Sequence, residues 1–136
     1  MTNIIDNGPN PFVSNIETLT LENDNYRTTL WTGANLQITL MSILPGHDIG
    51  LEVHMDHDQF LRIEQGQATV QMGTDKNNLE TWQASDNDAI IVPASTWHNV
   101  INNGEELLKV YSIYAPPEHP HGTIHVTKED ADKSEQ

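Results

Sequence analysis

The sequence lacks several features that mark common classes of protein. It contains no cysteine, which excludes disulfides and thiol nucleophiles. Lysine and arginine together number 6 against 20 aspartates and glutamates, so the formal net charge is -14. A surface this acidic repels phosphate backbones and anionic membranes. We therefore expect no nucleic acid and no membrane among the partners of this protein.

Long apolar runs and nucleotide-binding motifs are also missing. No apolar run approaches the length of a membrane span, and the first residues do not read as a signal peptide. The chain has no P-loop, no dinucleotide fingerprint and no Gly-x-Ser-x-Gly elbow. These absences argue against nucleotide-dependent chemistry and serine hydrolysis. We expect a cytoplasmic protein with a small-molecule substrate.

What the sequence does contain is a series of short segments rich in β-branched and aromatic residues, separated by turn signals. This pattern predicts an all-β sandwich or barrel. The expected strands are 17–22, 26–32, 36–44, 49–54, 59–65, 67–72, 89–93, 98–102 and 107–114. We expect one domain over 1–136 with its core at about 17–115, a flexible lead-in and an acidic tail that is either helical or disordered.

The stretch EVHMDHDQF, residues 52–60, concentrates polar side chains where a strand should alternate with apolar ones. Glu52 and His54 lie on one face of an extended segment. A turn over 55–58 reverses the chain, so that Gln59 on the return strand faces the same interior. His98 opens a later strand after a short turn and joins the other three if the sheet closes on itself.

The spacing of these residues resembles the two sequence motifs of the cupins. The first motif is matched in spacing by Gly46, Glu52, His54, Gln59 and Gly66. The second is matched over residues 87–102, with Pro93, His98 and Asn102 in register. Four residue types differ from the family pattern: Glu52 replaces a histidine, Gln59 replaces a glutamate, and Asn87 and Ser95 replace glycines.

This resemblance implies a small single-domain cupin of the mannose-6-phosphate isomerase-like group. The implied fold is a double-stranded β-helix, or jelly-roll barrel, and the implied assembly is a homodimer. The implied cofactor is a divalent transition metal, Mn, Fe, Zn or Ni, held by Glu52, His54, Gln59 and His98. This set carries the same single negative charge as the usual three histidines and one glutamate. Gln59 is either a direct ligand or a hydrogen-bonding partner of a metal-bound water.

The function that we predict is a metal-dependent cupin enzyme of lyase or isomerase type, acting on a small polar metabolite. Glu52 is the candidate catalytic base. An Fe-dependent dioxygenase is one alternative. The other is a non-catalytic cupin that binds a sugar-like molecule, in which Glu52, His54 and His98 form only a hydrogen-bonded polar cluster.

Other polar residues give weaker signals. We expect the 56–58 segment, including His57, to be a solvated turn. The histidines at 119, 121 and 125 suggest either a second metal site or a proline-restrained loop over the barrel surface, and we favour the loop. Arg62 is expected outside the barrel, and Arg27 on an early strand could reach a subunit interface.

Overall fold

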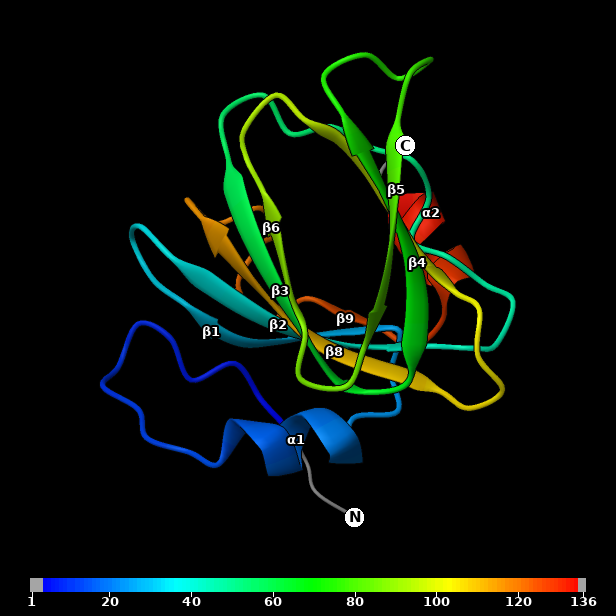
Figure 1. Ribbon diagram of the computed structural model, residues 1–136. Helices are drawn as coiled ribbons and strands as arrows, with labels where there is room; N and C mark the ends of the chain where they lie inside the picture. The colour runs from blue at the N-terminus through cyan, green and yellow to red at the C-terminus, as the bar shows by residue number, and fades with distance from the viewer. Residues whose placement is uncertain (1–3, 135–136) are drawn as a thin grey trace.

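Two antiparallel β-sheets face one another in this protein (Figure 1). The structure is a computed structural model that describes residues 4–134. The larger sheet has the strand order β6-β3-β8-β2-β1-β9, and the smaller sheet has the order β5-β4-β7. The strands are β1 Arg27–Thr32, β2 Gln37–Ile43, β3 Asp58–Gln65, β4 Gln67–Gly73, β5 Glu80–Ser85, β6 Ala89–Val92, β7 Trp97–Asn102, β8 Leu108–Ala115 and β9 Ile124–His125. The all-β prediction is confirmed.

Seven of the nine predicted segments coincide with strands, to within one residue at each end. The segment 17–22 was predicted wrongly, because it lies in helix α1, Ile16–Glu22. The Asn15 side chain accepts a hydrogen bond from the Thr18 backbone N–H at 3.0 Å and caps the helix. Thr20 is buried one turn after the half-buried Ile16, so the helical period decides which side chains meet the sheet.

The predicted strand over 49–54 is also wrong. Only two isolated bridges form there, Asp48 with Ile101 and Glu52 with His98. Between the two bridges, the three residues 49–51 therefore oppose the two residues 99–100, and this one extra residue is the mark of a β-bulge. Gly50 lies inside this bulge with a φ of +88°. The irregular segment runs along β7 and delivers Glu52 beside His98.

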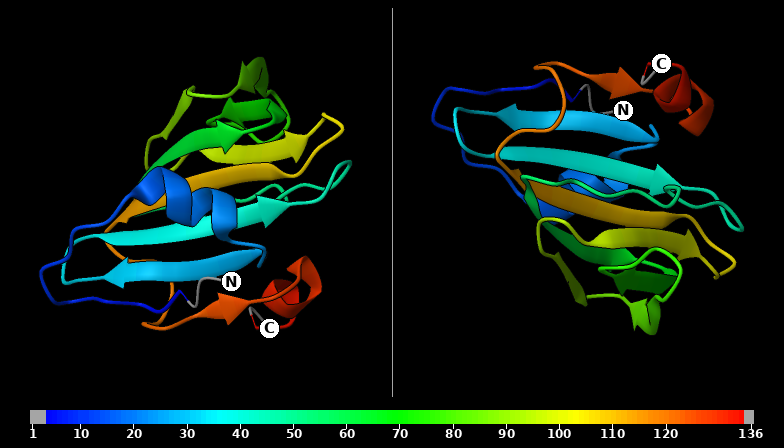
Figure 2. Two further views of the ribbon diagram at one scale, coloured as in Figure 1. Left: turned by 90° about the horizontal axis from the view of Figure 1, so that it is seen from below. Right: turned by 90° about the horizontal axis from the view of Figure 1, so that it is seen from above.

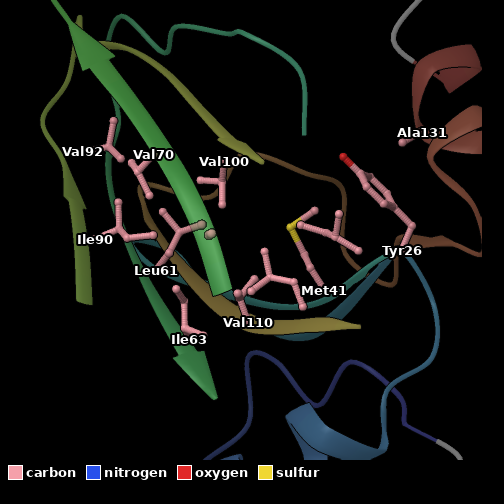
Figure 3. Close-up of a cluster of buried hydrophobic side chains, with 13 residues drawn as sticks. Tyr26, Met41, Leu61, Ile63, Val70, Ile90, Val92, Val100, Val110 and Ala131 are labelled. Carbon is pink, nitrogen blue, oxygen red and sulfur yellow. The ribbon is translucent and has the colours of Figure 1, made fainter. Parts of the chain in front are cut away.

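The inward faces of β2, β3 and β8 are polar at one end and apolar at the other. On β3, the buried Gln59 is followed by the core residues Leu61 and Ile63. Directly opposite on β8 lie Tyr114, Ser112 and Val110 in the same order. Figure 3 shows the apolar part of the interior, where Leu61, Ile63, Val70, Ile90, Val92 and Val100 lie between the two sheets. The polar part is left for the functional site.

Two short helices lie outside the barrel. Helix α1 packs against the outer face of the larger sheet, over β2, β3 and β8 (Figure 2). Helix α2, Lys128–Ser134, follows the edge strand β9 and settles the choice between a helical and a disordered tail for the residues it covers. Strand β5 was not predicted, because most of its side chains are exposed and supply no alternation of burial. Within residues 4–134, no helix is both long and apolar enough to span a membrane.

Candidate metal centre

Glu52 and His98 are fixed to each other by their backbones. The two residues exchange N–H···O hydrogen bonds of 3.0 and 2.9 Å across their bridge. Their side chains therefore leave the backbone on the same side. His98 is fully buried, with 0% of its surface exposed, so its imidazole points into the barrel.

His54 reaches the same place from the end of the irregular segment. Its carbonyl accepts a hydrogen bond of 2.8 Å from the Ser95 backbone N–H. Its Nδ1 lies 3.1 Å from the Glu118 carboxylate, and its ring packs edge-on against Tyr114 with the centroids 6.1 Å apart. The ring is thereby held in one orientation, with Nε2 toward Glu52.

The donor atoms of the three residues converge on one point. Oε1 of Glu52 lies 3.4 Å from Nε2 of His54 and 3.5 Å from Nε2 of His98. The three atoms all lie within 4.8 Å of one another. Ligands that hold one metal ion at about 2.0–2.2 Å each are separated by roughly 3 to 3.5 Å, so the observed spacing suits a shared ion.

Hydrogen bonds at the far side of the rings decide which nitrogens carry protons. Nδ1 of His98 lies 3.1 Å from the Thr96 carbonyl, which can only accept, so this nitrogen is protonated. Nδ1 of His54 lies at ion-pair distance, 3.1 Å, from the Glu118 carboxylate, and this negative charge favours a proton on that nitrogen. In the neutral rings both Nε2 atoms are then acceptors. With both rings neutral, three acceptors meet at this point, and a cation, either a metal ion or a second proton on an imidazole, would join them.

In the absence of a metal ion, protons on the imidazoles would take the place of the cation beside Glu52. Burial raises the pKa of its carboxyl, but the interactions with His54 and His98 outweigh burial and lower the pKa to about 2. The contacts of 3.4 and 3.5 Å are longer than the 2.7–2.9 Å of charge-assisted hydrogen bonds. The geometry is therefore not that of a tight carboxylate–imidazolium pair.

Gln59 is placed in the polar part of the interior from strand β3, where Tyr114 is its cross-strand neighbour. Only 3% of its surface is exposed. Its Nε2 donates to Ser112 Oγ at 2.8 Å, and its buried Oε1 has no hydrogen-bond partner among the described residues. The amide oxygen is thus available as a ligand or as an acceptor for a metal-bound water. The donor set as a whole fits a divalent transition metal.

Known proteins provide a comparison for this fold and for the placement of these residues. The family model for the cupin domain matches residues 39–114 of this chain. The chain belongs to the cupin family. The expected resemblance is confirmed at this level, and with it the all-β jelly-roll fold.

This cupin has relatives that are similar along almost its whole length. It is 58% identical over 127 residues to the uncharacterized protein YrkC of Bacillus subtilis, covering 93% of this chain and 68% of YrkC. It is 38% identical over 126 residues to the uncharacterized protein L612 of Acanthamoeba polyphaga mimivirus, covering 92% of this chain and 78% of L612. The crystal structure of BH2720 from Bacillus halodurans superposes with a TM-score of 0.95 at 56% identity, covering 96% of this chain and 99% of that one.

Asn87 and Ser95 stand where the second cupin motif has glycines, and their backbone conformations explain why the spacing of that motif is kept. Asn87 and Ser95 have φ angles of +74° and +64°, in the left-handed region that glycine adopts most easily. The turns of the family are therefore kept although the residue types differ. Asn87 also accepts a hydrogen bond of 3.1 Å from Arg62, which lies on the outer face as predicted.

The prediction that His57 is a solvated residue is wrong. Only 14% of its side chain is exposed, because its Nε2 lies 3.1 Å from the Pro117 carbonyl and its Nδ1 lies 2.9 Å from Asp56. His57 also lies 3.7 Å from Glu118, so that His54, His57 and Glu118 form a second group of convergent donors. No motif pointed to Glu118, which is brought here by the folding of the 116–119 segment over the barrel.

The histidines after Glu118 do not share a metal site in the described part of the chain, and His121 lies on a surface loop as expected. His119 and His125 differ from that expectation, because both turn inward. His125 is buried beside Arg27, and the His119 ring packs edge-on against Tyr114 with the centroids 5.4 Å apart. Gln37 holds this segment in place, since its amide bonds the His119 backbone N–H and carbonyl at 2.9 and 2.8 Å.

Proposed function

We propose that this cupin binds one divalent transition metal ion through Glu52, His54 and His98, with Gln59 beside it. The observation that carries the proposal is the meeting of three acceptor atoms at Oε1 of Glu52 with separations of 3.4 and 3.5 Å. A buried carboxylate beside two neutral imidazoles is costly without a cation, because no hydrogen atom lies between them to share. The electrostatic demand and the donor types agree on Mn, Fe, Zn or Ni.

The chemistry proposed for this site is that of a lyase or isomerase on a small polar metabolite. A bound divalent ion would polarise a carbonyl or hydroxyl oxygen of the substrate. The chain itself supplies the surroundings: Tyr114 packs edge-on against His54, His119 packs edge-on against Tyr114, and Glu118 lies beside the ring of His54. A carboxylate with a pKa of about 2 is a weak base at neutral pH, which favours the ligand role of Glu52 over its predicted catalytic role.

The first test is the metal content of the protein purified without an affinity tag. We expect about one equivalent of metal in the wild type and a loss of at least tenfold in metal retention in the His98→Ala variant, because the buried Nε2 is removed. His47→Ala is the matched control, since His47 is exposed on a turn. Its metal content should equal that of the wild type.

Two results would overturn parts of the proposal. Metal below a tenth of an equivalent after reconstitution would leave a cupin that binds small molecules without an ion. Consumption of dioxygen with candidate substrates, measured with an oxygen electrode, would replace lyase or isomerase chemistry with that of a dioxygenase.

A further inference from the structure

Arg27 is a buried cation inside the barrel. It opens β1 and lies directly opposite the core residue Met41 on β2 and His125 on β9, so its side chain faces inward. Only 5% of its surface is exposed. The expectation that Arg27 could reach a subunit interface does not agree with this placement.

No carboxylate pairs with this guanidinium. None of the ion pairs among residues 4–134 includes Arg27. Its partners are His125, whose Nδ1 lies 3.1 Å from Nη1, and the Tyr26 ring, whose centroid lies 5.2 Å from Cζ. The Nε atom is buried and has no hydrogen-bond partner among the residues that the structure describes. A buried charge is expensive unless it is paired, and neither neighbour here carries a negative charge.

The imidazoles around Arg27 are neutral, so they do not compete with it for an anion. Because a guanidinium can only donate, His125 must accept at Nδ1 and carry its proton at Nε2. That nitrogen lies 3.1 Å from Ser134 Oγ on helix α2, which ties the His125 ring to the helix. For His119, burial and then the charge of Arg27 lower the pKa to about 3.

A continuous row of rings joins Arg27 to the metal centre. The row starts at His54. The ring centroid of Tyr114 lies 6.1 Å from that of His54, and the centroid of His119 lies 5.4 Å from that of Tyr114. His125 follows at 6.3 Å from His119 and contacts Arg27. Two more buried polar atoms on this side, Nε2 of His119 and Oγ1 of Thr39, have no partner among the described residues. A cavity of about 270 Å³ is lined in part by Glu118, His119 and His125, the last of which contacts Arg27.

We propose that Arg27 binds the carboxylate of the substrate, so that the substrate class is a small carboxylate-bearing metabolite. The carboxylate site at Arg27 does not depend on the proposed function. Only the placement of another oxygen of the same substrate at the metal ion rests on it. With a divalent ion bound, Glu52 and Glu118 offset its charge, and the positive charge of Arg27 remains. One monoanionic carboxylate balances it, while a phosphate dianion would leave excess negative charge beside Glu52.

The test uses acetate as the probe and acetamide as its neutral analogue of the same shape. Acetate is titrated into metal-loaded and chelator-stripped protein at constant ionic strength, and two-dimensional NMR spectra follow the backbone amide signals around position 27 in every variant, together with the Nε–H signal where Arg27 is present. We expect saturable shifts with acetate in both forms and none with acetamide. In Arg27→Met, acetate binding should weaken at least about tenfold. Arg62→Met, on the outer face, should bind acetate as the wild type does.

Stability separates this role from a structural one. Removing an unpaired buried cation should leave the free energy of unfolding of Arg27→Met unchanged or higher, whereas a structural Arg27 would make the variant less stable. Arg27→Lys keeps the charge and should keep part of the acetate affinity. Equal acetate binding by the wild type and Arg27→Met, no acetate binding by the wild type, or tighter binding of inorganic phosphate than of acetate would overturn the proposal.

The two proposals fail separately. His98→Ala should lose metal and still bind acetate in the stripped form, because Arg27 is untouched. Arg27→Met should lose acetate and still retain metal. In the wild type, absence of acetate binding with normal metal content therefore counts only against the Arg27 site, and absence of metal with intact acetate binding counts only against the metal centre.

Discussion

At the scale of single residues, the proposed metal centre depends on groups that would not themselves contact the ion. Glu118 lies 3.1 Å from Nδ1 of His54 and sets the proton on that nitrogen. The Thr96 carbonyl does the same for His98. Partners of this kind orient the ring and raise the basicity of the ligating nitrogen, so they contribute to affinity without contact to the ion.

Glu118→Gln tests this contribution. The amide removes the charge that favours a proton on Nδ1, and we expect metal affinity to fall by about 10–100-fold while the fold is kept. Competition with a chelator of known affinity measures the change. Glu105→Gln, on an exposed loop, is the control. Equal affinity in Glu118→Gln and the wild type would show that Glu118 does not position His54.

At the scale of the secondary-structure elements, the sequence predicted best where spacing alone decides the result. The spacing of Glu52, His54 and His98 along the sequence was sufficient to predict that their side chains meet, because a bulge and a backbone bridge bring them together. Arg27 and His125 could not be paired from the sequence, since β9 has only two residues and meets β1 across nearly the whole chain. The helix α1 was missed because its alternating Thr and Leu residues imitate a strand.

The turn between β6 and β7 provides a prediction at this scale. Ser95 has a φ of +64° there, which a β-branched side chain tolerates poorly. We expect Ser95→Val to lower the free energy of unfolding by about 1–2 kcal/mol in chemical denaturation. Ser85→Val in the exposed strand β5 should change it by less than about 0.5 kcal/mol. Equal effects of the two substitutions would contradict the role given to the backbone at Ser95.

At the scale of the whole molecule, Asp6 joins parts of the chain that are far apart in sequence. Its carboxylate accepts hydrogen bonds from Thr32 Oγ1 at 2.6 Å and from the backbone N–H groups of Gly8 and Gly122 at 2.9 and 3.0 Å. Burial raises its pKa, but these hydrogen bonds, with Thr32 first, lower it below the ordinary value of 3.8. Asp6 thus stabilises the folded state in its charged form.

The sign of the resulting pH dependence follows from the lowered pKa. The stabilisation is fully present above the ordinary pKa and is lost as pH falls through the lower pKa of the folded state. At neutral pH, Asp6→Asn should lower the free energy of unfolding by about 1–2 kcal/mol, and the difference from the wild type should shrink below about pH 4. Denaturation curves at several pH values measure it. A difference that grows in acid would contradict this account.

The division of the barrel interior has a consequence for how this protein can change. The apolar end holds Leu61, Val70 and Val100, and the polar end holds Arg27 and His98. We expect substitutions at the apolar end to alter mainly the melting temperature and substitutions at the polar end to alter mainly the choice of ligand. Folding stability and ligand selectivity therefore depend on separate sets of positions. During evolution, the ligand can change through substitutions at the polar end while the barrel that holds it stays the same.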